Sequence, residues 1–168
     1  IYRVVLKQFV MKNKAVLLGA GGHAKVVYEA FLDSSEYSID TYSGKARDKY
    51  FERMECIEND EELLHGDQKV FLVNGIGINK NKTIRKIIYN KFKEKGHMFL
   101  NVIHSSASVS KTAVLSEGVQ VLALVVIQAN ACIGANSIIN DGAIIEHDVK
   151  VGKHCHISPG AILGGSVT

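Results

Sequence analysis

The fold of this chain is decided by the stretch Ile127-Gln-Ala-Asn-Ala-Cys-Ile133-Gly-Ala-Asn-Ser-Ile-Ile139-Asn-Asp-Gly-Ala-Ile-Ile145, in which an aliphatic residue returns at every sixth position. The same spacing continues in both directions, and the aliphatic residues in register are Ile103, Val109, Leu115, Val121, Ile127, Ile133, Ile139, Ile145, Val151, Ile157 and Leu163. A six-residue period advances by about 240° around a helical wheel, so it gives no single apolar helix face. Internal repeats of this kind indicate a solenoid.

Two further positions of the repeat predict its cross-section. The residue four places after each aliphatic residue is small or β-branched, as in Ala131, Ala143 and Val149. The corner position, three places after each aliphatic residue, includes Gly118, Asn130, Asn136, Gly142, Asp148 and Gly160. These residue types tolerate a positive φ angle. Because strand side chains alternate, each repeat supplies one short strand and one corner, and three repeats close a triangular coil of 18 residues. We therefore predict a parallel β-helix over residues 103–168, with Ile127, Ile145 and Leu163 in one column.

The overall composition limits the class of protein. The 168 residues are 46% apolar and 22% charged, as in an ordinary soluble globular protein, and no apolar run predicts a membrane helix. Residues 1–102 carry 17 Lys and Arg against 13 Asp and Glu, but no basic stripe interleaved with aromatic residues, so nucleic-acid binding is not expected. Three cysteines without disulfide or metal spacing favour a cytoplasmic protein.

Residues 14–102 have the pattern of a small Rossmann-like α/β domain. The predicted strands are 15–19, 37–42, 70–74 and 97–102. The predicted helices are 21–32 and 82–95, the latter with Ile84, Ile87, Ile88 and Phe92 on its apolar face. Between the first strand and helix, Gly19-Ala-Gly-Gly-His-Ala24 forms a loop whose backbone amides suit a phosphate. A tight turn without a ligand is the alternative. A nicotinamide cofactor is disfavoured, because Asp40 lies inside the second strand and not at its end.

The repeat resembles the hexapeptide acyltransferase superfamily, which implies a left-handed β-helix. The loop with Lys25-Val-Val, followed by such a β-helix, resembles the sialic-acid O-acetyltransferase and bacillosamine-pathway N-acetyltransferase family, the NeuD/PglD type. This resemblance implies that the α/β domain binds a nucleotide-linked sugar through Gly21, Gly22 and His23. It also implies acetyl-CoA as co-substrate and a homotrimer.

The segment Glu146-His-Asp carries the predicted chemistry. Acetylation requires a base that removes a proton from the attacking amine or hydroxyl, and a histidine beside a carboxylate suits that task. The resemblance implies that His147 is this general base, that Asp148 increases its basicity, and that His156 contacts the acetyl donor. The repeat places His147 at an outer corner and His156 on the opposite side, which predicts active sites between subunits. His154 is expected at the surface, and no metal is expected.

Several alternatives stay open at this point. A metal-dependent hydratase with this β-helix and a non-catalytic partner of a sugar-synthesis enzyme are the competing functions. Met11 has the sequence of a natural start, so residues 1–13 are expected to be a non-native or disordered lead, and the β-helix is expected to be truncated at its C-terminus. The isolated His65 and His97 are expected at the surface.

Overall fold

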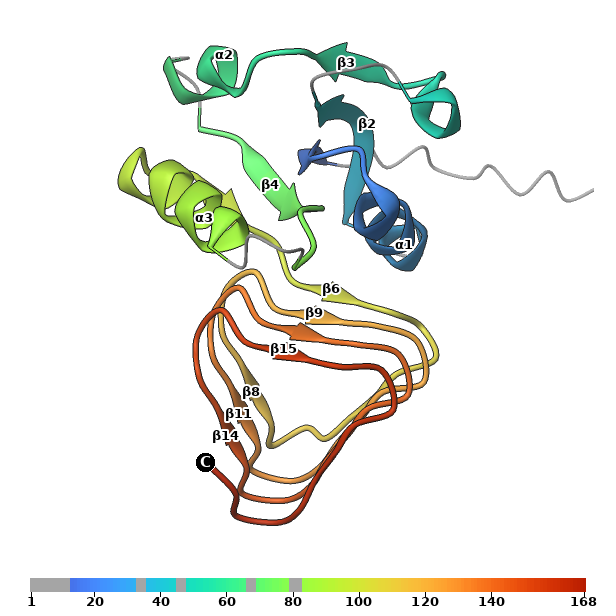
Figure 1. Ribbon diagram of the computed structural model, residues 1–168, viewed down its shortest axis with the longest axis vertical. Helices are drawn as coiled ribbons and strands as arrows, with labels where there is room; N and C mark the ends of the chain where they lie inside the picture. Colours follow the sequence, from blue (N-terminus) through green and yellow to red (C-terminus); the bar gives the residue numbers. More distant parts are fainter. Residues whose placement is uncertain (1–12, 33–35, 45–47, 66–68, 79–82) are drawn as a thin grey trace, which may run out of the picture.

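The computed structural model describes residues 13–32, 36–44, 48–65, 69–78 and 83–168. Figure 1 shows two units, an α/β domain and a triangular prism, with one side of the prism turned toward the α/β domain. The expectations for residues 1–12 lie outside the described residues. No helix in the described ranges is long and apolar enough to cross a membrane.

A parallel five-stranded sheet forms the centre of the α/β domain. Its strands are β1 (Asn13–Leu18), β2 (Tyr37–Ser43), β3 (Glu55–Ile57), β4 (Phe71–Asn74) and β5 (Met98–Phe99), in the order β3-β2-β1-β4-β5. The helices are α1 (Gly22–Phe31), α2 (Asp60–His65) and α3 (Ile84–Glu94), with one 3-10 turn at Lys49–Phe51. The order of the strands reverses between β1 and β4, and ligands bind at such a point in open α/β sheets.

Both faces of this sheet are covered because successive residues of β1 point to opposite sides. Ala15 and Leu17 belong to the same buried cluster as Val27 of α1. Val16 and Leu18 belong to a second cluster that includes Phe92 of α3. The continuous apolar run of β1 therefore reflects burial on both faces.

The prism is the predicted β-helix, built from eleven two-residue strands that stack in three flat sheets. Face I contains β6 (Val102–Ile103), β9 (Gln120–Val121), β12 (Ile138–Ile139) and β15 (His156–Ile157). Face II contains β7 (Ser108–Val109), β10 (Val126–Ile127), β13 (Ile144–Ile145) and β16 (Ile162–Leu163). Face III contains β8 (Val114–Leu115), β11 (Cys132–Ile133) and β14 (Lys150–Val151).

The predicted cross-section is confirmed. Ile127 pairs with Ile145 and Ile145 with Leu163 in parallel register, which is the expected 18-residue column. Ala143 and Ile145 are fully buried, whereas Ile144 between them is half-buried on the outside. Every corner residue named above has a positive φ angle, and Leu124, His154 and Ser166 share this conformation at the same position of other repeats.

Parts of the α/β domain differ from the prediction. The apolar face predicted for the second helix is confirmed only in part. Phe92 is buried and Ile88 packs against its cluster. Ile84 and Ile87 of α3 are exposed, however, and Arg85 and Tyr89 are buried in their place. The reason is that α3 packs beside the β-helix, where Arg85 donates to the backbone carbonyl of Asn136 at 3.2 Å. The strand predicted at 97–102 is divided into β5 and β6, which belong to different sheets.

Three short elements were not predicted, and the surface position predicted for His97 is wrong. β3, α2 and the 3-10 turn are each too short to show a period, so the sequence does not predict them. His97, expected at the surface, is fully buried, and its Nδ1 accepts a hydrogen bond from the Val70 backbone at 3.3 Å. The side chain of His65 lies outside the described part of the chain.

Candidate functional site

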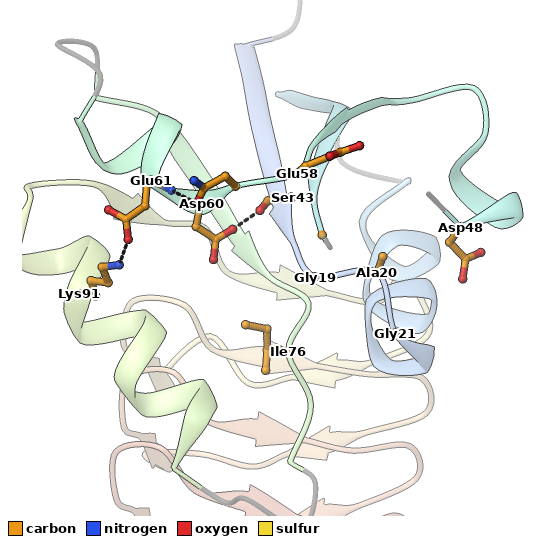
Figure 2. Close-up of a pocket in the computed structure, with 12 residues that line it drawn as sticks. Gly19, Ala20, Gly21, Ser43, Asp48, Glu58, Asp60, Glu61, Ile76 and Lys91 are labelled. Carbon is orange, nitrogen blue, oxygen red and sulfur yellow. Dashed lines mark hydrogen bonds and ion pairs between the residues drawn. The ribbon is translucent and has the colours of Figure 1, made fainter. Parts of the chain in front are cut away.

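A crevice of about 560 Å³ opens at the carboxyl ends of the sheet strands, beside the point where the strand order reverses. Figure 2 shows Gly19, Ala20 and Gly21 on one side of it and Asp60, Glu61 and Lys91 on the other. The Ser43 hydroxyl donates to a carboxylate oxygen of Asp60. In the wall of the crevice, Lys91 Nζ and Glu61 Oε1 form an ion pair with a separation of 2.6 Å. The crevice therefore has polar groups in its wall and lies at the position where nucleotides bind in open α/β sheets.

The glycine-rich loop leads from this crevice into a second hollow of about 360 Å³. Gly19 has a φ of 96°, a conformation that glycine adopts without strain. A Cβ atom at Gly21 or Gly22 would meet nothing within 4 Å, so the backbone at the start of α1 is open to the hollow. Exposed amides at a helix N-terminus attract anions, which suits the predicted phosphate contact.

His23 forms the inner wall of this second hollow. Its Nε2 lies 2.9 Å from Oε1 of Gln120, a residue of β9 on face I. Burial lowers the pKa of His23 to about 4, and the nearby Arg85 guanidinium adds to that shift. His23 is therefore neutral at physiological pH. Gln120, which joins the loop to the β-helix, was not predicted as a site residue.

His147 lies at an outer corner of the prism, between β13 and β14, as predicted. Its side chain is 61% exposed, and its Nδ1–H donates to Oδ2 of Asp148 at 2.9 Å. Asp148 Oδ1 accepts a second hydrogen bond from Asn130 at 3.3 Å. These two contacts, that with His147 first, hold the pKa of Asp148 below its usual value. Within the described residues, no hydrogen bond engages the other ring nitrogen, Nε2, which leaves its lone pair available for proton transfer.

The position of the His147 ring depends on a glycine one coil later. A Cβ atom at Gly165 would lie 2.6 Å from His147 Nε2 and 2.7 Å from Cε1. The backbone of Ser166 also donates to the carbonyl of His147 at 2.9 Å, which joins the two corners. The absence of a side chain at Gly165 is therefore a requirement for the observed ring position. Gly165 was not predicted as a site residue.

His156 lies on β15 of face I and is half-buried. Its Nε2 accepts a hydrogen bond from Asn140 at 3.1 Å, and burial, followed by the charge of Arg85, lowers its pKa. His156 shares an outward column with Ile138 and Gln120, so it lies on the same side of the prism as His23. One chain therefore brings His156 toward the glycine-rich loop but keeps it away from the corner that carries His147.

The other candidate residues are explained by packing or by surface charge. His154 is not a surface residue as expected: it is half-buried, with its ring centroid 5.5 Å from that of Tyr89. Asp40 forms an exposed ion pair of 2.9 Å with Lys14, away from the end of β2. In the described ranges, no group of three His, Cys, Asp or Glu side chains could hold a metal ion.

Comparisons with known proteins agree with this geometry. Residues 14–92 match the family described as the PglD N-terminal domain, and residues 133–165 match the bacterial transferase hexapeptide family. A variant of perosamine N-acetyltransferase from Caulobacter crescentus, solved with CoA and GDP-perosamine, is 32% identical, with a TM-score of 0.78 over 92% of this chain and 72% of that one. The chain belongs to the NeuD/PglD-type family of sugar acetyltransferases.

A second solved structure supports the same assignment. The acetyltransferase domain of PglB from Neisseria gonorrhoeae, in complex with acetyl coenzyme A, is 29% identical, with a TM-score of 0.81 over 92% of this chain and 74% of that domain. The protein is thus an acyltransferase of this family that uses acetyl-CoA. The family assignment favours acetyl transfer over the hydratase and over the non-catalytic partner.

Proposed function

We propose that the protein acetylates the amino group of a nucleotide-linked 4-amino sugar, with His147 as the general base. The observation that carries this proposal is the exposed His147 imidazole, whose Nδ1 is bound to Asp148 while no described hydrogen bond engages Nε2. The Caulobacter enzyme, which holds GDP-perosamine, supports this class of acceptor. Sialic acid is the other acceptor of the family and belongs in the same test.

The chemistry is a direct transfer. The amine nitrogen attacks the thioester carbonyl, a C–N bond forms, and the C–S bond to coenzyme A breaks. His147 Nε2 takes the proton that the amine loses, and the Asp148 carboxylate stabilises the imidazolium that results. Coenzyme A leaves as a thiolate, which the imidazolium can protonate. The transfer needs no covalent acetyl-enzyme. Cys155 packs against the core of the prism, and the Sγ of Cys132 donates to the backbone carbonyl of Asn130 at 3.6 Å.

The sugar nucleotide is proposed to lie along the crevice and the second hollow of the α/β domain. Gly21 and Gly22 would hold its phosphates through backbone amides, and His23 would contact the sugar. His156 would contact the acetyl donor from face I. Because acetyl-CoA and a sugar nucleotide are the substrates and the described cysteines are all free, we place the enzyme in the cytoplasm, where it would supply glycan biosynthesis.

A homotrimer completes the site in this proposal. His147 lies at the corner opposite face I, whereas His23 and His156 lie over face I. A corner of one subunit against face I of its neighbour would bring the base to the sugar. Ile162 on the outside of face II is 67% exposed, and Leu124 at a corner is 69% exposed. Such apolar residues on a regular prism are consistent with contacts between subunits.

The test measures thiol release from acetyl-CoA by the full chain. The acceptors are UDP- and GDP-linked 4-amino sugars and free sialic acid, with His147→Ala as the inactive variant. General-base catalysis predicts a loss of about 10²- to 10⁴-fold in kcat for this variant, while its binding of sugar nucleotide stays unchanged. Wild-type turnover by His147→Ala would refute the role of His147. Acetylation of sialic acid alone would refute the proposed acceptor.

A further inference from the structure

A buried chain of hydrogen bonds crosses from the β-helix to the glycine-rich loop. The backbone carbonyl of Asn74, at the end of β4, accepts from Nε2 of Gln120 at 2.7 Å. It also accepts from Nη1 of Arg85 at 2.9 Å. Oε1 of Gln120 then lies 2.9 Å from Nε2 of His23. At most 1% of the surface of Gln120 and of Asn74 is exposed, so water cannot substitute for these contacts.

The chemistry of these groups leaves one arrangement of protons. A carbonyl oxygen can only accept, so the amide nitrogen of Gln120 must be the end that faces Asn74. The amide oxygen of Gln120 must then face His23, and it too can only accept. The hydrogen of the imidazole therefore lies on Nε2 of His23. In a neutral imidazole this leaves Nδ1 with a lone pair and no hydrogen.

The opposite edge of the His23 ring faces the second hollow. Gly77 packs against the side of the ring that carries Cδ2, where a Cβ atom at Gly77 would lie 2.8 Å from the Cβ of His23 and 3.1 Å from its Cγ. Within the described part of the chain, Nδ1 has no hydrogen-bond partner and is not among the buried unpaired atoms. His23 lines the hollow together with Gly21 and Gly22. Nδ1 is thus an accessible acceptor beside the proposed phosphate-binding amides.

Charge supports the same arrangement. Burial lowers the pKa of His23 to about 4, so a second proton on the ring is disfavoured at neutral pH. A phosphate oxygen carries no hydrogen at neutral pH and would be repelled by the Nδ1 lone pair. A hydroxyl or an amine of the sugar can donate to it. His23 and the loop amides therefore suit different parts of a sugar nucleotide.

We propose that His23 Nδ1 accepts a hydrogen bond from an O–H or N–H group of the acceptor sugar, and that Gln120 is the positioning residue that fixes this tautomer. The inference rests on the proposed function for the identity of the ligand. The tautomer itself does not, because Asn74, Gln120 and His23 set it in the free protein.

The first experiment observes the tautomer directly. The full chain, labelled with ¹⁵N in histidine, is studied at pH 7 by two-bond ¹H–¹⁵N correlation, and His23→Asn identifies the signal of His23. We expect the neutral Nε2–H form. An Nδ1–H form or an imidazolium at pH 7 would overturn the proposal, whatever the enzyme acetylates and whether or not Gln120 variants fold.

The second experiment measures the consequence in Gln120→Leu, with Gln128→Leu as the matched control. Gln128 is an exposed glutamine of the same β-helix. We expect the kcat/KM for the UDP- or GDP-linked 4-amino sugar to fall by about tenfold in Gln120→Leu, on the scale of one lost hydrogen bond. The KM for acetyl-CoA and the pH dependence of kcat should stay unchanged. An equal loss for both substrates, or no loss for the sugar, would refute the positioning role. Failure of the wild type to acetylate any sugar would refute the proposed function and leave the tautomer result standing.

Discussion

Replacing Gly165 by alanine is expected to lower kcat by about 100-fold without unfolding the protein. The new Cβ would lie 2.6 Å from His147 Nε2, whereas carbon atoms in contact prefer separations of about 3.5 to 4.0 Å. The ring must therefore move by about 1 Å, and a displacement of that size costs about 10²-fold in rate. In free energy this is about 2.7 kcal/mol of transition-state stabilisation.

The assay is thiol release from acetyl-CoA, combined with thermal unfolding. Gly165 is exposed and does not have a positive φ angle, so alanine is compatible with its backbone and stability should change by less than about 0.5 kcal/mol. Gly164→Ala is the matched control, because a Cβ atom there would meet nothing within 4 Å. Wild-type kcat in Gly165→Ala, or an equal loss in Gly164→Ala, would refute this account of how the base is positioned.

Four further predictions follow from the same contacts. Asp148→Asn removes the carboxylate that stabilises the His147 imidazolium, so kcat should fall by about 10²-fold with acetyl-CoA binding unchanged; full activity in a thiol-release assay would contradict this. Because the pKa of His23 falls from 6.5 to about 4 on folding, the unfolded chain binds more protons between these pH values, and the folded state should lose about 3 kcal/mol as the pH drops through that window. Melting curves from pH 7 to pH 4 should show a smaller loss in His23→Asn, and an identical pH dependence would be inconsistent with the shift. Arg85→Ala removes three hydrogen bonds to backbone carbonyls and should lower the free energy of unfolding by about 3 kcal/mol, measured with denaturant; a change below about 0.5 kcal/mol would show that these bonds are dispensable. Co-expressed His147→Ala and His156→Ala chains should regain about a quarter of wild-type activity if sites form between subunits of a cyclic trimer, and the absence of recovery would place both histidines in one chain's site.

The β-helix and the place of its candidate base could be predicted from the sequence because they depend on local order. A period of six residues fixes which side chains enter the prism, so Ala143 and Ile145 are buried and the corner residues take positive φ angles. The same period puts His147 outside and Asp148 beside it. Each of these properties requires only knowledge of neighbours along the chain and of the 18-residue coil.

The sequence predicted less well which side chains of α3 are buried. The apolar pattern of α3 suggested that Ile87 would be buried, but it is 57% exposed, and Arg85 is buried instead. The helix period shows which residues share a face, but the neighbouring surface decides which face is covered. Here the neighbour is the β-helix, whose backbone at Asn136 accepts from Arg85.

The sequence alone determined the architecture, the glycine-rich loop and the histidine–carboxylate pair, because these follow from residue type and spacing. The contact between His23 and Gln120, 97 positions later, and the position of His147 beside Gly165 become visible only in the folded chain. Both contacts join segments that meet only after the chain has coiled and the two domains have docked. These long-range contacts set the proton positions and ring orientations on which the chemistry depends. A pattern of residues along the chain does not predict them.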